Sequence, residues 1–295
     1  FFDSSRQLIN GPTNAISIAV LSVTAAIADP GDKINTIIVM SLLIGCIQTA
    51  IALLRLGDIT KYISHSVIVG FTVGASLLLV IDQMKNLLGK KAMGGVHDHF
   101  LMRFWRSMTE GGDVHLYTLW VGLASIALVL GLRWAKQRLH FPLLPELLIT
   151  VISVSAITAL LGLEGVGVVG TIPASLPSFH FPHTEWVFIK EIAPSALAIA
   201  TLGLLEAIAM AKSIASAKRQ QLDLNQQCLS EGLANMGGGF FQCIPGSGSL
   251  TRSAINTQAG AITQWSGVFS AVAVAAIVLL FAPLAQYIPK ACLAG

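Results

Sequence analysis

The stretch CIPGSGSLTRSAINTQAGA, residues 243–261, interrupts a long apolar part of the chain with glycine, proline, small hydroxyls and one arginine. Around it the sequence is nearly free of charge, because Asp, Glu, Lys and Arg are absent from residues 232–251 and 253–289. A helix that spans a bilayer needs about 20 predominantly apolar residues. The second run is too long for one such helix, and polar residues break it near 258–264. This part of the chain therefore predicts membrane helices, one of which is interrupted at its start.

The whole chain has the composition of a membrane protein. Of its 295 residues, 54% are hydrophobic and 11% are charged, and the mean hydropathy is +0.73. These values predict an all-α polytopic membrane protein. Charge-free runs and their polar borders place about nine spans, at residues 12–28, 34–54, 63–82, 115–133, 146–162, 192–212, 226–243, 248–262 and 265–282.

The net charge, the chain ends and the distribution of basic residues bear on three separate questions. The net charge is only +3 and no basic stripe is interleaved with aromatic residues, so we expect no nucleic-acid partner. The first residue is not methionine, and the last residues begin a new apolar segment, so we expect a fragment of a longer chain. Basic residues divide evenly between the two sides and do not decide the orientation.

Two broken segments resemble each other. RQLINGPTNAIS (residues 6–17) and FQCIPGSGSLTRSAI (residues 241–255) each carry Gln-x-Ile before a Gly/Pro interruption, after which a helix restarts. Paired Gly/Pro-interrupted apolar segments in two halves of a chain are the sequence pattern that points to the midplane site of an inverted-repeat transporter. We therefore expect the ligand site where these two segments meet.

The second broken segment has the chemistry of an anion site. Ser247 or Ser249 can cap a helix that begins near Leu250, which puts Arg252 in the first turn of that helix. Free backbone N–H groups, the positive end of the helix dipole and a guanidinium then converge. Gly246 and Gly248 allow an anion to approach the backbone. The alternative is an ordinary kink with Arg252 reaching toward the membrane surface.

The first broken segment repeats this device without a charge. Gly11 and Pro12 interrupt the chain, and Thr13 and Asn14 open a helix. If the two helix starts face each other, backbone donors and hydroxyls can hold a small anion such as sulfate, bicarbonate or chloride. We expect no metal and no cofactor at this site.

Glu206 is an acid deep in an apolar span, and ionisable groups at such positions are costly enough to suggest function. Its carboxyl can carry a proton together with the anion, or it can form a structural ion pair with Arg252. The sequence leaves both readings open.

Enzyme and metal readings are weaker. The GSGS stretch at 246–249 allows an intramembrane serine hydrolase, but a nucleophile needs a base, and most of the seven histidines lie outside the expected spans. The HDH stretch at 97–99 has metal-capable side chains, yet it lies in a polar loop without a helical i, i+4 partner.

Several stretches together resemble the sulfate permease (SulP) family of anion transporters, as a bacterial member. They are SSRQLINGPTNAIS (4–17), YISHSVIVGFTVGASLLLVIDQMKNLLG (62–89), GLLEAIAMAKSIA (203–215), LSEGLANMGGGFFQCIPGSGSLTRSAINTQAGA (229–261) and TQWSG (263–267). The resemblance covers nearly the whole chain, and the GPT and SLTRSA segments are its most specific parts.

The resemblance implies a larger architecture. It implies fourteen spans in two inverted repeats of seven, a core domain, a gate domain and a cytoplasmic STAS domain. This chain then runs from the third span to the start of the twelfth, with core parts at 1–56 and 190–283 and gate parts at 57–165 and 284–295, and it lacks the STAS domain. The family also implies an elevator-like mechanism, a homodimer formed through missing regions and, for a bacterial member, the inner membrane.

Position by position, the resemblance assigns substrate binding to Gly11, Pro12, Thr13, Ser249, Thr251 and Arg252, and coupling to Glu206. Gly248 joins the expected substrate-binding residues because it lets an anion approach the backbone. A glutamate in that span favours proton coupling over sodium coupling. One position departs from the family pattern, because Ile262 follows Ala259-Gly260-Ala261 where a basic residue is usual. The expected function is secondary active transport of a small inorganic anion, sulfate first. The alternatives are bicarbonate, chloride or dicarboxylate transport, an anion channel or exchanger, or the intramembrane hydrolase.

Overall fold

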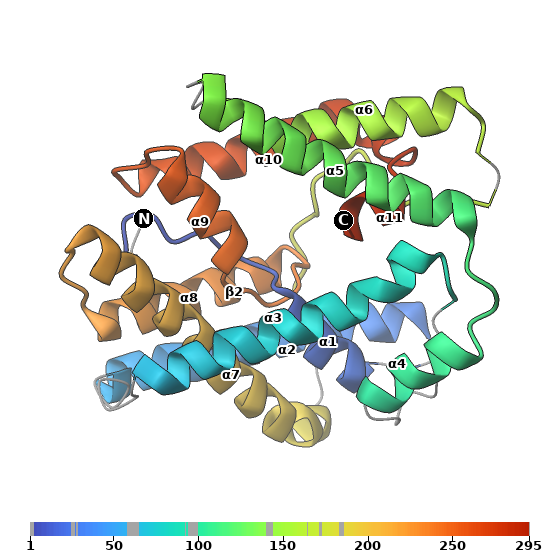
Figure 1. The fold of residues 1–295 in the computed structure, drawn as a ribbon. Helices are drawn as coiled ribbons and strands as arrows, with labels where there is room; N and C mark the ends of the chain where they lie inside the picture. Colours follow the sequence, from blue (N-terminus) through green and yellow to red (C-terminus); the bar gives the residue numbers. More distant parts are fainter. Residues whose placement is uncertain are drawn as a thin grey trace. The chain divides into compact units, whose positions relative to one another are not determined.

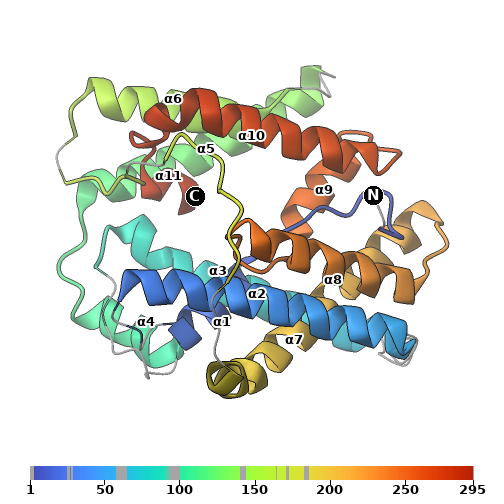
Figure 2. The same cartoon turned by 180° about the vertical axis from the view of Figure 1, so that it is seen from behind.

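The computed structural model describes residues 3–24, 27, 29–57, 65–91, 93, 100–139, 144–163, 165–170, 173–182 and 186–294. Helices dominate this part of the chain (Figures 1 and 2). The elements are α1 (Asn14–Thr24), α2 (Pro30–Leu53), α3 (His65–Leu88), α4 (Phe100–Thr109), α5 (Leu116–Leu139), α6 (Glu146–Leu160), α7 (Trp186–Lys218), α8 (Leu224–Phe240), α9 (Leu250–Gln258), α10 (Trp265–Ala285) and α11 (Lys290–Ala294), with the two short strands β1 (Asn10–Gly11) and β2 (Ser247–Gly248).

The chain divides into two compact units. Unit 1 contains residues 1–72 and 176–274, and unit 2 contains residues 73–175 and 275–295. Helices α3 and α10 each begin in unit 1 and continue into unit 2. The two interrupted segments that the sequence analysis singled out both belong to unit 1.

Unit 1 is built on the packing of α2 against α8 and α7, and α2 and α8 run side by side in both ribbon views (Figures 1 and 2). Small residues permit this close approach. A Cβ on Gly45 of α2 would come within 2.5 Å of the Met236 backbone nitrogen, and a Cβ on Gly239 of α8 within 2.7 Å of Leu42 Cγ. The adjoining apolar core joins α1, α2 and α7 through Ile16, Val20, Met40, Ile44, Ala196, Ile199 and Ala200.

Aspartate caps fix the starts of the two packed helices. The Asp29 side chain accepts a hydrogen bond from Asp32 N, and Pro30 occupies the first helical position of α2. The Asp223 side chain accepts from Asn225 N and Gln226 N at the start of α8. Such caps satisfy N–H groups that a helix cannot pair internally, so both helix starts are defined by local sequence.

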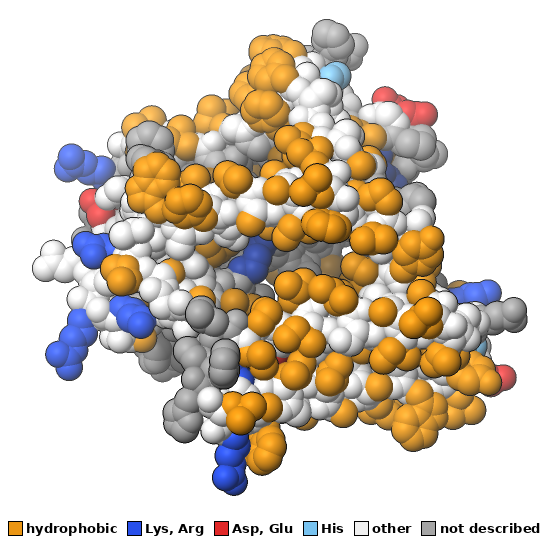
Figure 3. Space-filling model, turned by 90° about the horizontal axis from the view of Figure 1, so that it is seen from above, with side chains coloured by type: hydrophobic (Ala, Val, Ile, Leu, Met, Phe, Trp, Pro, Cys, Tyr) orange, Lys and Arg blue, Asp and Glu red, His pale blue; other side chains and the backbone are white. Residues whose placement is uncertain are grey.

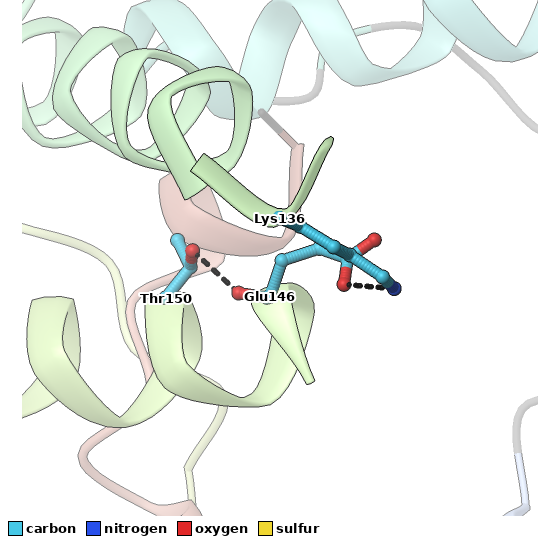
Figure 4. A network of polar contacts seen from close by, with 3 residues as sticks. All are labelled: Lys136, Glu146 and Thr150. Carbon is cyan, nitrogen blue, oxygen red and sulfur yellow. Dashed lines mark hydrogen bonds and ion pairs between the residues drawn. The ribbon is translucent and has the colours of Figure 1, made fainter. Parts of the chain in front are cut away.

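Unit 2 has its own apolar core, in which α5, α6 and α11 meet through Val121, Val154, Ala291 and Cys292. An ion pair joins Lys136 Nζ of α5 to Glu146 Oε2 of α6 at 2.9 Å (Figure 4). Thr150 Oγ1 donates to the Glu146 carbonyl oxygen at 2.8 Å in the same network. The ion pair joins the end of α5 to the start of α6, whereas the Thr150 bond lies within α6.

Four helical segments among the described residues are long and apolar enough to cross a membrane: Gly31–Leu53, Leu116–Leu139, Phe188–Lys218 and Trp265–Ala285. The last of these leaves Phe269 and Leu280 about 70% exposed (69% and 71%), as expected for side chains that meet lipid. Apolar side chains cover much of the face drawn in Figure 3. The all-α multi-pass class is confirmed.

Several expected spans are wrong in length. The span expected at 248–262 is the nine-residue helix α9, and the one at 12–28 is the eleven-residue α1. At about 1.5 Å per residue, neither reaches across a hydrocarbon core of about 30 Å. Helix α9 ends where Gly260 takes a φ of +88° and Ala261 N donates to Asn256 O. Both helices are therefore half-length.

Two other differences concern connections. The loop expected at 85–113 contains α4, and α7 extends beyond the expected 192–212 to Trp186 and Lys218. The HDH stretch at 97–99 lies outside the described residues.

Candidate functional site

The two interrupted segments meet in a short antiparallel strand pair. Asn10 lies opposite Gly248, and Gly11 opposite Ser247. Helix α1 begins three residues after β1, and α9 begins two residues after β2. The starts of two half-length helices, distant in sequence, are therefore held together by backbone hydrogen bonds.

Glycine is needed where these backbones approach one another. A Cβ on Gly246 would lie 2.6 Å from the Gly11 carbonyl carbon, and a Cβ on Gly248 would lie 2.9 Å from Ala207 Cα in α7. Any larger residue would push β2 away from β1 or from α7. This requirement explains the Gly-x-Gly spacing in the opening stretch of sequence.

A buried amide anchors the break before β2. Asn235 of α8 accepts a hydrogen bond from Gly246 N at 2.8 Å and donates to Gly246 O at 3.1 Å. It also donates to Gln48 Oε1 at 2.8 Å, and Gln48 donates to Ala200 O. The network ties the loop to α2, α7 and α8, and the sequence analysis did not identify it.

Arg252 lies in the first turn of α9 and reaches the start of α1. Its Nη2 donates to Pro12 O at 2.8 Å, and a Cβ on Gly11 would lie 2.8 Å from its Nη1. Pro12 O is the one hydrogen-bond acceptor that the described residues supply to this guanidinium. Since a guanidinium has five N–H donors, most of its donors are left for a ligand.

Glu206 is bound by hydroxyls. Its Oε2 accepts hydrogen bonds from Thr13 Oγ1 at 2.9 Å and from Ser247 Oγ at 2.6 Å. No ion pair joins it to Arg252, although the structure describes both residues. Of the two readings that the sequence left open, the structural ion pair is therefore wrong.

The remaining predicted residues lie at the start of α9. Ser249 is 7% exposed and occupies the N-cap position, where its side chain makes no capping bond. Its N–H donates to Ile9 O at 2.9 Å, while Ile9 N donates to Ser253 Oγ at 2.9 Å. Thr251 is exposed. Sequence reasoning missed Ser247 and Ser253 as structural partners, although both lie inside the stretch that it singled out.

Ile262, the departure from the family pattern, is 72% exposed and lines a cavity of about 540 Å³. Arg6, Lys218 and Arg219 line the same cavity. Three basic side chains from other segments thus supply positive charge at the place where a basic residue is usual.

The whole chain is similar to a known protein family. The model of the sulfate permease family matches residues 1–295. The chain belongs to the sulfate permease family. This is a family of transporters and not a class of enzymes, so the hydrolase reading is set aside.

Curated relatives include sulfate transporters from plants and bacteria. The chain is 31% identical over 300 residues to the chloroplastic sulfate transporter 4.1 of Arabidopsis thaliana, covering 100% of this chain and 43% of the plant protein. It is 29% identical over 293 residues to the putative sulfate transporter YvdB of Bacillus subtilis, covering 99% of this chain and 54% of the bacterial protein. The chain thus spans about half the length of these relatives.

Solved structures have the same fold. The transmembrane domain of the cyanobacterial bicarbonate transporter BicA aligns with a TM-score of 0.81 at 25% identity, covering all of this chain and 76% of that one. The structure of SLC26A9 aligns with a TM-score of 0.83 at 20% identity, covering all of this chain and 49% of that one. The fold is therefore that of membrane transporter domains.

Proposed function

We propose that the protein containing this chain moves a small inorganic anion, sulfate first, across a membrane by secondary active transport. The observation that carries the proposal is the meeting of two half-length helices at β1 and β2, with the Arg252 guanidinium at the start of α1. Membership of the sulfate permease family supports it. So do the names of the plant and Bacillus relatives.

The anion is held by donors from both helix starts. The first N–H groups of α1 and α9 have no partner within their helices, and each helix dipole places partial positive charge there. Gly11, Pro12 and Gly248 let the anion approach the backbone, Thr13, Ser249 and Thr251 offer hydroxyls, and Arg252 supplies the full charge. A sulfate oxygen takes the place of Pro12 O on the guanidinium or shares it, because a charged acceptor binds more strongly than a carbonyl.

Glu206 couples transport to protons in this scheme. Its carboxyl is bound by Thr13 and Ser247, which also belong to the two half-helix segments, so its charge state acts on the walls of the anion site. Protonation removes a negative charge close to the anion, which favours joint binding of the proton and the anion. Sodium coupling is the alternative.

The two compact units support an elevator-like mechanism. The proposed core parts at 1–56 and 190–283 share most of their residues with unit 1, and the proposed gate parts at 57–165 and 284–295 with unit 2, although residues 57–72 fall in unit 1 and 275–283 in unit 2. We propose that the core carries the site against the gate, and that the full protein is a homodimer in the inner membrane.

Bicarbonate, chloride and dicarboxylates remain alternative substrates, and BicA, a neighbour in fold, is a bicarbonate transporter. A channel or uncoupled exchanger is the alternative mechanism. Backbone donors and one arginine distinguish similar anions weakly, so the choice must come from measurement.

The test is radiolabelled sulfate uptake by the full-length protein in proteoliposomes, with and without an inward proton gradient. We expect accumulation above equilibrium that requires the gradient, with weaker competition from bicarbonate and dicarboxylates than from unlabelled sulfate. Equilibration without accumulation under any proton or sodium gradient would indicate a channel. Absence of sulfate flux alongside bicarbonate flux would contradict the substrate assignment.

A further inference from the structure

The cavity of about 540 Å³ that Ile262 lines has no role in the function proposed above. It lies at the far end of α9 from the proposed anion site. Helix α9 carries Arg252 in its first turn, whereas Gly260 and Ala261, which lie beyond its last residue, line the cavity. The other walls come from the N-terminal segment and from residues 218–221 at the end of α7. A volume of this size is typical of a ligand pocket.

The charged side chains of this cavity are all basic. Arg6, Lys218 and Arg219 line it, and no acid is among the described residues that do so. None of the three side chains forms an ion pair or a hydrogen bond with another described residue. Lys218 lies in the last turn of α7, where a cation complements the helix dipole. The dipole does not account for Arg6, which the fold brings to the same cavity from the N-terminal segment.

Side-chain amides hold the three segments around the cavity together. Gln220 Nε2 donates to Gln7 Oε1 at 2.7 Å, and Gln7 Nε2 donates to Ala261 O at 3.1 Å. Gln7 is buried, and Asn256 Nδ2 donates to its carbonyl oxygen at 3.0 Å. The three basic residues are therefore attached to walls that are already fixed, which lowers the entropy cost of gathering them around a ligand.

Two helices that are long and apolar enough to cross a membrane have an end beside the cavity. The segment Phe188–Lys218 ends at one of the basic lining residues, and Trp265–Ala285 begins three residues after Ile262. Trp265 is half-exposed, as is common for tryptophan at a membrane surface. The cavity thus lies near the level of the lipid phosphates, where basic pockets between membrane helices bind lipid head groups.

Ile262 gives the rim of the cavity an apolar part. Its side chain is exposed, and it stands where the family pattern has a basic residue. A fourth cation there would suit a small free anion. An exposed isoleucine beside three cations suits an anion that carries hydrocarbon, because the hydrocarbon removes apolar surface from water. The departure from the family pattern therefore favours a lipid over a free ion.

We propose that this cavity binds a phosphate monoester, supplied by an anionic lipid such as phosphatidic acid whose chains lie against Ile262. The guanidinium groups of Arg6 and Arg219 each match a phosphate with paired N–H donors, and Lys218 adds a third charge. Free inorganic phosphate has the same binding chemistry, so the test must separate the two sources. The inference does not depend on the transported anion or on its coupling.

Native mass spectrometry of the full-length protein in detergent measures the binding of dioleoyl phosphatidic acid and dioleoyl phosphatidylcholine. We expect phosphatidic acid to bind more tightly. Combining Arg6→Gln, Lys218→Gln and Arg219→Gln should weaken its binding by about tenfold or more, because charge-assisted hydrogen bonds are lost. The variant should unfold at the wild-type temperature, since the three side chains have no partner among the described residues. Equal binding of the two lipids by the wild-type protein would overturn the proposal.

A matched control removes the same charge elsewhere. It combines Arg133→Gln, Arg138→Gln and Lys190→Gln, all at exposed positions outside the cavity. This variant should bind phosphatidic acid as the wild type does. Equal loss of binding in the two triple variants would indicate general attraction of anionic lipid to basic residues and would overturn the site.

Two further measurements separate a lipid from free phosphate. Ile262→Ser should weaken the binding of phosphatidic acid several-fold, whereas Ile277→Ser, at an exposed position of α10, should not. Titration calorimetry should show much weaker binding of inorganic phosphate than of the lipid. Phosphate binding as tight as that of phosphatidic acid, together with unchanged lipid binding in Ile262→Ser, would overturn the assignment to a lipid.

Discussion

At the residue scale, Arg252 and Glu206 have separate partners although both adjoin the β1–β2 pair. Arg252 donates to the Pro12 carbonyl, and Glu206 accepts from two hydroxyls. Because the two charges do not neutralise each other in an ion pair, the guanidinium is available to an anion and the carboxyl is available to a proton. The proposed joint binding of an anion and a proton depends on this separation.

Replacing Glu206 by Gln tests the coupling role. The amide oxygen still accepts hydrogen bonds from Thr13 and Ser247, so the fold should persist while the titratable group is lost. We expect sulfate exchange to continue and the dependence of uptake on the proton gradient to disappear. Uptake in proteoliposomes at several imposed gradients measures this, with Glu191→Gln as the control in the same helix. An unchanged gradient dependence would remove Glu206 as the proton carrier.

Asp3 gives the fold a predictable pH dependence. Its pKa rises from 3.8 to about 6 through burial, so between these values the folded state binds more protons than the unfolded state. Stability should therefore fall as pH rises from about 4 to about 6, by about 3 kcal/mol for the full shift.

In Asp3→Asn this part of the pH dependence should vanish, because asparagine keeps the acceptor for Ser5 N without titrating. Thermal unfolding of the full-length protein between pH 4 and 7 is the measurement, and the exposed Asp113→Asn is the control. Equal pH profiles for wild type and Asp3→Asn would contradict the account.

At the scale of elements, the site depends on two helices that are too short to span. Helices α1 and α9 begin at the strand pair, and α7 and α8 hold that pair through Ala207 and Asn235. The longer helices thus provide the rigid support, while the half-length helices present their N-terminal N–H groups.

Gly248→Ala should disturb this arrangement. The added Cβ would lie 2.9 Å from Ala207 Cα, a backbone atom that cannot move independently of α7. We expect destabilisation of about 1–3 kcal/mol, as for other overpacked sites, together with weaker sulfate transport. Gly237→Ala in α8 is the matched control, since its Cβ would meet no atom within 4 Å beyond its chain neighbours and the backbone of its own helix. Thermal unfolding and uptake should show a defect only in the first variant, and equal behaviour of the two would refute the packing argument.

Local sequence predicted the start of α9 well and its length poorly. Pro245, the Gly-x-Gly spacing and Ser249 define a helix start, which is why Arg252 was correctly expected in the first turn. The spans read from charge-free runs were longer than both half-length helices. Helix α9 ends at polar residues and Gly260, where no charged residue marks its end. Charged residues indicate where a membrane span cannot lie, but their absence does not indicate where a helix ends.

The sequence did not predict which side chains from distant segments form hydrogen bonds with one another. Nothing near Thr13 or Ser247 indicates that both bind Glu206, about 190 and 40 residues away in the chain (193 and 41). Asn235 bonding to Gly246 and the burial of Glu231 likewise depend on how α8 packs. Side chains from distant segments pair only once the helices have packed. Local sequence patterns predict single helices, and they do not predict which side chains meet.

At the scale of the whole molecule, the proposed elevator-like mechanism requires one compact unit to move relative to the other. Unit 1 holds every proposed ligand of the anion, and unit 2 is built around the separate core of α5, α6 and α11.

Spin labels test this rearrangement in a cysteine-free full-length protein. One label on α5 and one on α7 should give two distance populations in double electron–electron resonance, and their ratio should change with sulfate. A pair on α2 and α8, which pack together within unit 1, should give one unchanged population. A single sulfate-independent distance between the units would argue against an elevator-like mechanism.

The central claim is that an anion binds between the starts of α1 and α9 with the help of Arg252. Titration calorimetry of sulfate into the purified full-length protein tests it most directly, comparing wild type with Arg252→Ala and with the exposed Arg133→Ala as control. A charge-assisted hydrogen bond contributes about 1.5–3 kcal/mol, so Arg252→Ala should weaken sulfate binding by about tenfold to a hundredfold. Arg133→Ala should bind sulfate as wild type does. Equal sulfate affinity in Arg252→Ala and wild type would contradict the account.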